Sequence, residues 1–195
     1  PPTTSTVEME TARIIPDKDS YAPNETAKLL IQSPFKDAEG LLLVNHDGLV
    51  TEQRFTLQGN SHTLELPLKP EWLPNVNLSV NLVGQTPRRT EDGKETKLPE
   101  RPAMASADLV LKISKAERVL TVKVKPQTEV LAPAEATPIT VQVQNAKGEP
   151  VANAEVALVV ADEAILTAGA YQLTDPLDTF YPESSPLMMA QYFRS

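Results

Sequence analysis

The chain has 195 residues, of which 41% are hydrophobic, and its formal net charge is −8. That length is enough for one large or two small domains with a buried core. The negative charge argues against nucleic-acid binding, because neutralising phosphates requires a surface rich in lysine and arginine. Cysteine is absent, which excludes a disulfide framework, a cysteine nucleophile, a thiolate metal site and a cysteine-based thioester within this stretch.

The start of the chain has the composition of a linker. No basic region followed by an apolar stretch opens it, so we interpret residues 1–9 as a linker and the whole stretch as part of a longer chain. The longest apolar runs, at 41–44 and 154–161, are far shorter than the ~18 residues that cross a bilayer. We therefore expect no transmembrane segment in this fragment.

Residues 10–114 have the pattern of short strands separated by polar and proline-containing turns. Apolar and polar residues alternate strictly from Thr63 to Leu68 and from Asn75 to Val83, as strands that bury one face require. A charge-balanced stretch without periodicity, residues 86–105, is predicted to be a long exposed loop. The spacing favours a closed antiparallel sandwich of seven strands, expected at 11–16, 26–33, 40–46, 49–57, 61–67, 75–84 and 106–114.

The second block, from Lys115 onward, contains fewer elements. Strands are predicted at 117–126, 137–146 and 154–161, followed by a short helix at 163–168 with Asp162 as its N-cap. Three strands do not close a sandwich, so the second unit is expected to be incomplete here. The blocks share a proline-bearing turn before a strand, near Pro23 and near Pro133. Tandem related domains and convergent turn chemistry both explain that similarity.

Candidate catalytic and metal-binding residues are few. The two histidines, His46 and His62, have no ligand-type residue at metal-binding spacing, and His46-Asp47-Gly48 is typical of a turn between two strands. Adjacent carboxylates such as Asp162 and Glu163 do not converge on one bond, which favours a capping role. We therefore predict no catalytic residue, no metal site and no cofactor.

Three motifs follow one another in the second block. They are Gly148-Glu149-Pro150-Val151, the run 161–166 with Asp162-Glu163 at its centre, and the run 175–181, Asp-Pro-Leu-Asp-Thr-Phe-Tyr. In this order they resemble the macroglobulin-type domain of bacterial alpha-2-macroglobulins that immediately precedes and carries the bait region. Residues 21–35 and the strand after them are similar to the opening of that family's preceding domain, so the resemblance covers about residues 10–181. The chain departs from the family at Ala161, where valine is usual, and after Tyr181, where an arginine-rich continuation is expected.

The resemblance implies an all-β fold of tandem macroglobulin-type (fibronectin III-like) antiparallel β-sandwiches, the first over 10–114 and a partial second over 115–181. It also implies a broad-range protease inhibitor, not an enzyme, in which a protease cuts an exposed bait and is then enclosed. The implied partners are endopeptidases of several specificities and neighbouring macroglobulin-type domains of the same chain. The implied location is the periplasm or cell envelope of a bacterium, with a lipoprotein parent as one option. The family's thioester motif does not lie in this stretch.

The C-terminal residues 182–195 are expected to begin the bait. A protease binds its substrate as an extended strand and selects side chains by its pockets, so a bait must offer several side-chain types. The tail does so, with Leu187, Met188 and Met189 for elastase-like proteases, Tyr192 and Phe193 for chymotrypsin-like ones, and Arg194 for trypsin-like ones.

Two alternatives remain open for the tail and for the chain as a whole. In the first alternative, the tail residues pack as a strand or short helix of the incomplete second sandwich. In the second alternative, the whole chain is a tandem β-sandwich module for adhesion or glycan binding on a cell surface. The single tryptophan, Trp72, and the four tyrosines make the stacking surface for sugars poor, and we expect Trp72 to plug one end of a sandwich.

Overall fold

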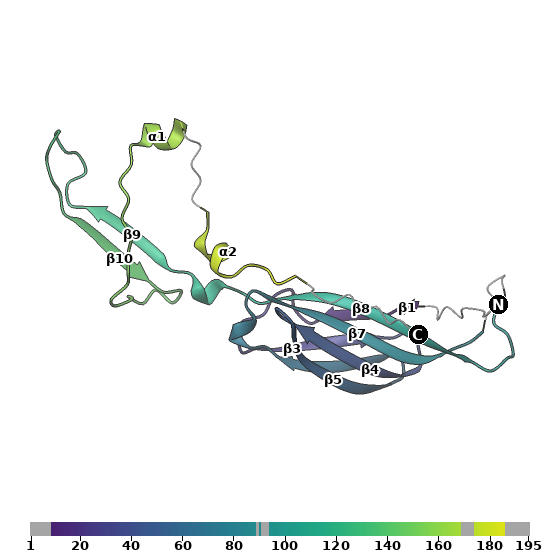
Figure 1. The fold of residues 1–195 in the computed structure, drawn as a ribbon. Helices are drawn as coiled ribbons and strands as arrows, with labels where there is room; N and C mark the ends of the chain where they lie inside the picture. Colours follow the sequence, from purple (N-terminus) through teal and green to yellow (C-terminus); the bar gives the residue numbers. More distant parts are fainter. Residues whose placement is uncertain (1–8, 89, 91–93, 169–173, 186–195) are drawn as a thin grey trace. The chain divides into compact units, whose positions relative to one another are not determined.

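The computed structural model describes residues 9–88, 90, 94–168 and 174–185, and these form two compact units (Figure 1). One unit extends as far as Ser114 and also takes in the segment that starts at Glu183. The other unit comprises Lys115–Pro182. The chain therefore leaves the first unit, builds the second, and returns to the first.

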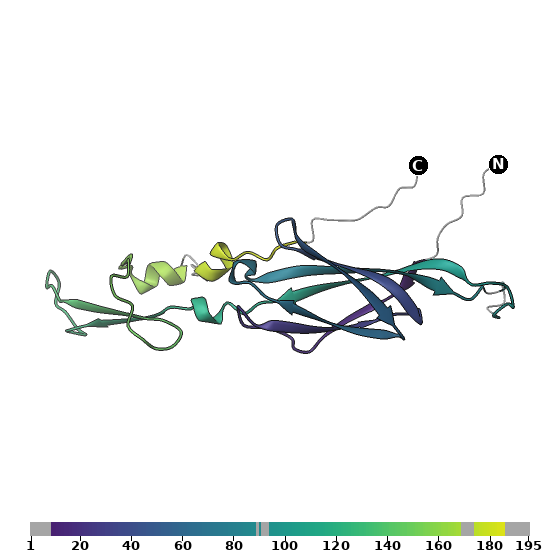
Figure 2. The ribbon, with the colours of Figure 1, turned by 90° about the horizontal axis from the view of Figure 1, so that it is seen from below.

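The first unit is a sandwich of two sheets, whose strands lie in two layers in the view of Figure 2. The larger sheet has the order β1 (Met9–Thr11), β8 (Arg101–Lys112), β7 (Asn75–Thr86), β4 (Asp37–Asn45) and β5 (Leu49–Gln58). The smaller sheet has the order β2 (Arg13–Pro16), β3 (Thr26–Gln32) and β6 (Ser61–Pro67). The fold is all-β, as predicted.

Alternation along the strands builds the core between the sheets. In β7 the buried apolar residues Val76, Leu78, Val80 and Leu82 are 0–1% exposed, and Ala27, Leu29 and Ile31 of β3 are fully buried. Successive side chains of a strand point to opposite faces, so these residues face the smaller and larger sheet respectively. Trp72 ends a 3₁₀ turn at Pro70–Trp72 and is only 3% exposed. This burial fits the plug role predicted for Trp72, which stays a prediction.

The structure corrects two expectations for the first unit. The strand predicted at 11–16 is divided at the buried Ala12, because Met9–Thr11 pairs with β8 in parallel while Arg13–Pro16 pairs with β3 in the other sheet. The sandwich is therefore not wholly antiparallel. Part of the loop predicted at 86–105 is strand, since β8 begins at Arg101 and pairs with Thr86 of β7. The extension does place Ala103 and Ala105 in the core, at 1% and 0% exposure. Proline and alanine are depleted in strands, so residues 101–105 give little strand signal.

The second unit contains one antiparallel hairpin, β9 (Thr121–Pro126) with β10 (Ile139–Gln144), and two short helices, α1 (Glu163–Ala168) and α2 (Pro176–Phe180). The N-cap predicted for α1 is confirmed, because Ala164 N donates to Asp162 Oδ1 at 2.7 Å. Helix α2 was not predicted. Its signal is Asp175, whose carboxylate accepts from Leu177 N at 2.9 Å ahead of a proline at the first helical position.

The strand predicted at 154–161 is wrong. These residues are in no helix or strand, and Val159 and Val160 are 84% and 83% exposed. A strand requires a neighbour that accepts its hydrogen bonds. Among the described residues of the second unit, the β pairing consists of β9 with β10 and one isolated bridge, Gln144 with Pro150. The apolar sequence of 154–161 thus matches a strand for which the described residues supply no partner.

Candidate functional site

The chain returns to the first unit at Ser184, which lies against the outer face of β7. Asn75 and Asn77 occupy that face, since they alternate with the core residues of the same strand. The Asn75 side-chain amide accepts a hydrogen bond from Ser184 N (2.9 Å) and donates one to Ser184 O (3.0 Å). This is the pairing that a residue of an adjacent strand would make. Asn75 therefore binds the main chain of Ser184 as a strand edge would.

Two further contacts complete the attachment of Ser184. Asn77 Nδ2 donates to the same carbonyl oxygen at 3.0 Å, and Asp47 N donates to Ser184 Oγ at 3.2 Å. Asp47 lies in the predicted turn between β4 and β5, where its φ is 52° and that of Gly48 is 133°. His46 of the same turn donates from Nδ1 to Asn75 O at 3.0 Å. Ser184 is 8% exposed as a result. Below, the contacts of Asn75, Asn77 and Asp47 with Ser184 are called the Ser184 anchor.

The face under the anchor is unusually polar for a buried surface. Asn45 of β4 is the register partner of Asn77, and the two residues are 7% and 5% exposed. Among the described residues, no donor reaches Asn45 Oδ1 or Asn77 Oδ1. A buried acceptor without a donor is costly, by about 1–3 kcal/mol. The anchor therefore rests on hydrogen bonds and has little of the apolar burial that stabilises the core.

The chain leaves the first unit beside the point where it returns. Ile113 N donates to Pro74 O at 2.7 Å, and Ser114 N donates to Tyr21 O at 2.8 Å. Pro74 immediately precedes Asn75, which holds Ser184. Both ends of residues 115–182 are thus attached to the first sandwich at one corner, around Pro74 and Asn75.

Tyr21 is a buried tyrosine that secures the departing strand. Its hydroxyl donates to Asp17 Oδ1 at 2.7 Å and accepts from Lys18 N at 3.1 Å. Burial, and then the hydrogen bond to the Asp17 carboxylate, raise the pKa of Tyr21 to about 12. The same hydrogen bond, together with one from Lys28 N, holds the pKa of Asp17 below its usual range. Glu25 forms an ion pair with Lys18. Its carboxylate also accepts a hydrogen bond from Ala22 N at 2.9 Å and so stabilises the turn at residues 22–25.

The raised pKa of Tyr21 predicts a loss of stability at alkaline pH. The unfolded chain ionises this tyrosine near its ordinary pKa of 10.0, whereas the folded chain keeps it protonated up to about 12. The contribution of Tyr21 to the free energy of unfolding is therefore complete below pH about 10 and is lost by pH about 12. At ~1.36 kcal/mol per pKa unit, the free energy of unfolding falls by about 2–3 kcal/mol over this range. Urea unfolding across this range measures it. The variant Tyr21→Phe should lack this part of the decrease, and Tyr181→Phe should retain it. An equal alkaline loss in Tyr21→Phe and the wild type would contradict the assignment.

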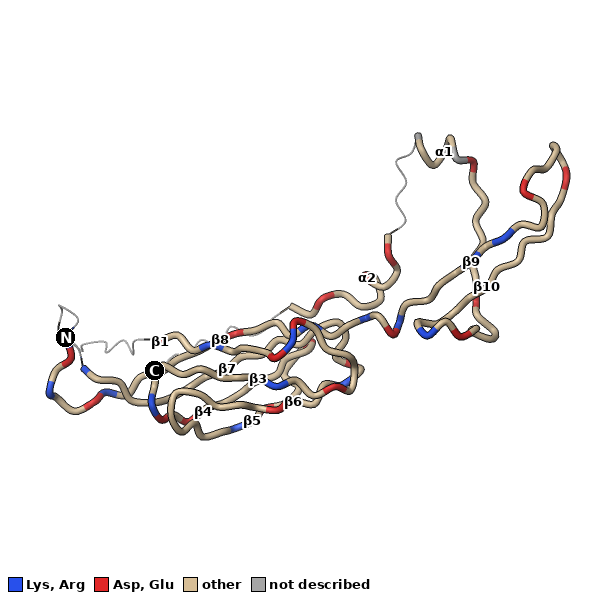
Figure 3. The backbone as a smooth tube through the Cα atoms, turned by 180° about the vertical axis from the view of Figure 1, so that it is seen from behind, with Lys and Arg blue, Asp and Glu red and all other residues tan. Residues whose placement is uncertain are grey.

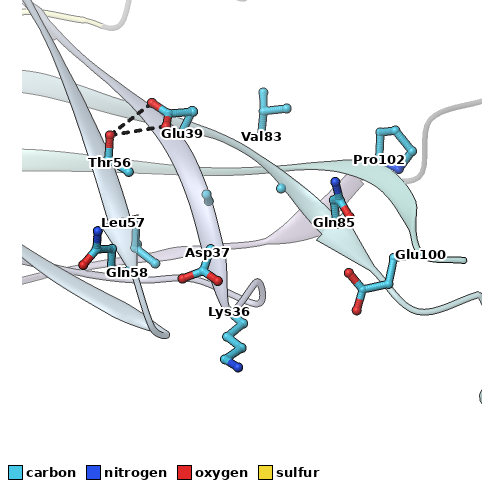
Figure 4. A pocket seen from close by; sticks show the side chains of 12 residues that line it. Lys36, Asp37, Glu39, Thr56, Leu57, Gln58, Val83, Gln85, Glu100 and Pro102 are labelled. Atoms are coloured by element: carbon cyan, nitrogen blue, oxygen red, sulfur yellow. Dashed lines mark hydrogen bonds between the residues drawn. The ribbon is translucent and has the colours of Figure 1, made fainter.

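An open hollow of about 900 Å³ lies elsewhere on the rim of the first sandwich (Figure 4). Its side chains include Lys36, Asp37, Glu39 and Glu100, and Thr56 Oγ1 donates to both oxygens of Glu39 at 3.3 Å. Neither a histidine nor a cysteine lines it. A Ser-His or Cys-His pair, two common arrangements for nucleophilic catalysis, is therefore not assembled there.

The predicted bait residues lie outside the described residues; they are Leu187, Met188, Met189, Tyr192, Phe193 and Arg194. Within the part of the chain that the structure describes, no three His, Asp or Glu side chains come together as a metal site. In the same part, no helix is long and apolar enough to cross a membrane. His62 stacks on Phe55, with ring centroids 5.3 Å apart, and so has a packing role.

Sequence reasoning missed the residues of the Ser184 anchor. The alternation in 75–83 correctly places the apolar residues in the core, but it predicts that the polar residues are in water. Asn75 and Asn77 are instead buried by a segment more than a hundred residues away. Three asparagines on one face of a single strand, at 75, 77 and 81, are the one local hint, because asparagine is depleted in strands.

Lys and Arg positions alternate with Asp and Glu positions along the described backbone (Figure 3). This distribution is in line with the formal net charge of −8.

Residues 12–168 match the family model described as the alpha-2-macroglobulin bait region domain. A protein of Nostoc sp. (strain PCC 7120) described as an alpha-2-macroglobulin homolog is 29% identical over 171 residues, which cover 86% of this chain and 9% of that protein. A Dictyostelium discoideum protein named circularly permutated Ras protein 2 is 28% identical over 192 residues, which cover 95% of this chain and 4% of that protein. The chain thus spans less than a tenth of the length of these curated relatives.

Proposed function

The chain belongs to the alpha-2-macroglobulin family, and from this premise we propose that it forms part of a broad-range protease inhibitor. In this proposal, a protease cuts the segment after Ser185, and the cut releases a conformational change in the parent protein that traps the protease. The observation that carries the proposal is the family match over residues 12–168, which is specifically to the bait region domain.

The composition of the C-terminal residues supports the proposal. Within a few positions they offer Leu187, Met188 and Met189, then Tyr192, Phe193 and Arg194. These side chains suit the pockets of elastase-like, chymotrypsin-like and trypsin-like proteases. One short segment can therefore be cut by proteases that share no specificity, which a broad-range inhibitor needs.

The partners and the location follow from the same proposal. The proposed partners are endopeptidases of several specificities, and further macroglobulin-type domains of the parent chain. The proposed location is the periplasm or cell envelope of a bacterium, where such an inhibitor would meet proteases from outside and contribute to host defence. The proposed activity is inhibition and not catalysis.

Limited proteolysis tests the proposal. The full chain is treated briefly with elastase, chymotrypsin or trypsin, and the first cuts are mapped by intact-mass spectrometry. Elastase and chymotrypsin are expected to cut first after residues 187–193, because cleavage needs a segment that can extend into the active-site cleft without unfolding a domain. Paired strands such as β4 and β7 should resist, since they open only at a large fraction of the global unfolding free energy.

The stretch 87–100, between β7 and β8, is an internal reference for that experiment. It contains Arg88, Lys94 and Lys97 for trypsin but offers little to elastase, so trypsin alone does not discriminate. If residues 187–194 outlast 87–100 against all three proteases, they are not a bait, and the alternative of an ordinary packed segment stands.

A further inference from the structure

We propose that the Ser184 anchor fixes the upstream boundary of the segment that proteases can cut. Asn75 and Asn77 are, on this view, positioning residues that hold the main chain just ahead of the proposed bait. The proposal deepens the proposed function and rests on it for the identity of the downstream segment. The anchor itself rests only on contacts among described residues.

The anchor blocks cleavage at residues 183–185 by occupying the groups that a protease must bind. A protease pairs with the backbone of an extended substrate as if adding a strand. At Ser184 the backbone N–H is taken by Asn75 Oδ1, and the carbonyl oxygen accepts from both Asn75 Nδ2 and Asn77 Nδ2. The peptide cannot enter an active site until these hydrogen bonds break.

The anchor also restrains the residues just upstream. Phe180, at the end of α2, is 77% exposed and is followed by Tyr181. Chymotrypsin cuts after exposed phenylalanines, so the exposure of Phe180 alone would allow cutting there, whereas Pro182 protects the bond after Tyr181. A stretch tied at Ser184 has less freedom to extend into a cleft than a stretch with a free end. The anchor thus directs chymotrypsin to sites downstream of Ser185.

The anchor contacts the main chain of Ser184 more than its side chain. Three of the four hydrogen bonds involve the backbone of Ser184, and only Asp47 N contacts its hydroxyl. A residue with another side chain can therefore be held in the same way, but a proline cannot, because it lacks the N–H that Asn75 binds.

The polar character of the anchor makes it reversible. Opening it would return Asn45, Asn75 and Asn77 to water, which can satisfy the two acceptors that lack a protein donor. An apolar contact of the same size would lose far more on opening, because its apolar surface would become hydrated. The anchor can therefore hold the segment before cleavage and let it go during a conformational change.

The test compares the first chymotrypsin cuts in four variants of the full chain. The double variant Asn75→Ala with Asn77→Ala and the single variant Ser184→Pro remove the anchor from opposite sides. Both are expected to raise the initial cleavage rate after Phe180 about tenfold, because proteolysis follows the population of the open segment. Ser184→Ala should have a small effect. Asn81→Ala, on the outer face of β7 but outside the anchor, should have none.

The positions of the cuts separate the anchor from general stability. Cleavage in 87–100 by trypsin should be unchanged in every variant, and a rise there would show that the sandwich itself is loosened. Ser184→Pro lies outside all strands, so it tests the anchor even if the double variant fails to fold. An unchanged rate at Phe180 in Ser184→Pro would overturn the proposal. If the wild type is cut first outside 186–195 but the variants still gain cuts at Phe180, the proposed function fails while the anchor stands.

Discussion

Replacing Phe35 by alanine is expected to lower the free energy of unfolding of the first sandwich by about 3–5 kcal/mol. Phe35 is 1% exposed, and its ring lies directly on Gly84 of β7. A Cβ atom at Gly84 would be 2.5 Å from Phe35 Cγ and 2.6 Å from Cδ2. The ring therefore fills a space that no other side chain at this position of β7 could share, and its removal leaves a cavity.

The same contact predicts a reversal of sign at Gly84. In the wild type, Gly84→Ala should destabilise the sandwich by about 1–3 kcal/mol, because the methyl group meets the ring. In the Phe35→Ala background it should stabilise the sandwich, since the methyl group fills part of the cavity and alanine lowers the entropy of the unfolded chain.

Urea unfolding of the single and double variants measures this coupling directly. Phe180→Ala is the matched control, because Phe180 is 77% exposed and its loss should cost little. If Gly84→Ala has the same effect with and without Phe35, the ring does not rest on this glycine.

Replacing Leu42 by alanine is expected to cost about 2–5 kcal/mol. Leu42 lies in β4 between Gln53 of β5 and Val80 of β7, and it is fully buried. The next residue, Leu43, points to the opposite face of the same sheet and is partly exposed. Leu43→Ala should therefore cost much less than Leu42→Ala.

The pair Leu42 and Leu43 tests which face of the larger sheet is the core. Both are leucines in adjacent positions of one strand, so strand propensity is the same and only burial differs. Equal losses of unfolding free energy in the two variants would contradict the two-layer arrangement. Chemical denaturation with fluorescence of the single tryptophan, Trp72, follows the transition, since Trp72 is buried in the same unit.

Strands in which apolar and polar residues alternate could be predicted from the local sequence alone. The alternation in β3 and β7 predicted both the strands and their core residues, and Asp162 predicted the start of α1. These features depend on side chains within a few residues of each other, so one sequence contains them.

Features that depend on distant partners could not be predicted in this way. The division of the first strand at Ala12 requires β8 and β3 to lie on either side of it, and these strands come later in the chain. The run 154–161 has the residues of a strand, but pairing decides whether a strand forms. The burial of Asn75 and Asn77 depends on Ser184, whose attachment has no local signature. The site was therefore less predictable than the core.

The chain leaves the first sandwich at Ser114 and returns to it at Ser184, at the same corner. Residues 115–182 are therefore connected to the first sandwich in the way an inserted module is. All eight strands of the first sandwich end by Lys112, so its two sheets contain no strand from the later residues. An inserted module whose two stems meet at one point of its host can lengthen, shrink or be exchanged over evolutionary time while the host keeps its fold. Pro74 and Asn75 together form the attachment point of this module. Among relatives, we expect residues 115–182 to vary more in sequence than the strands of the first sandwich.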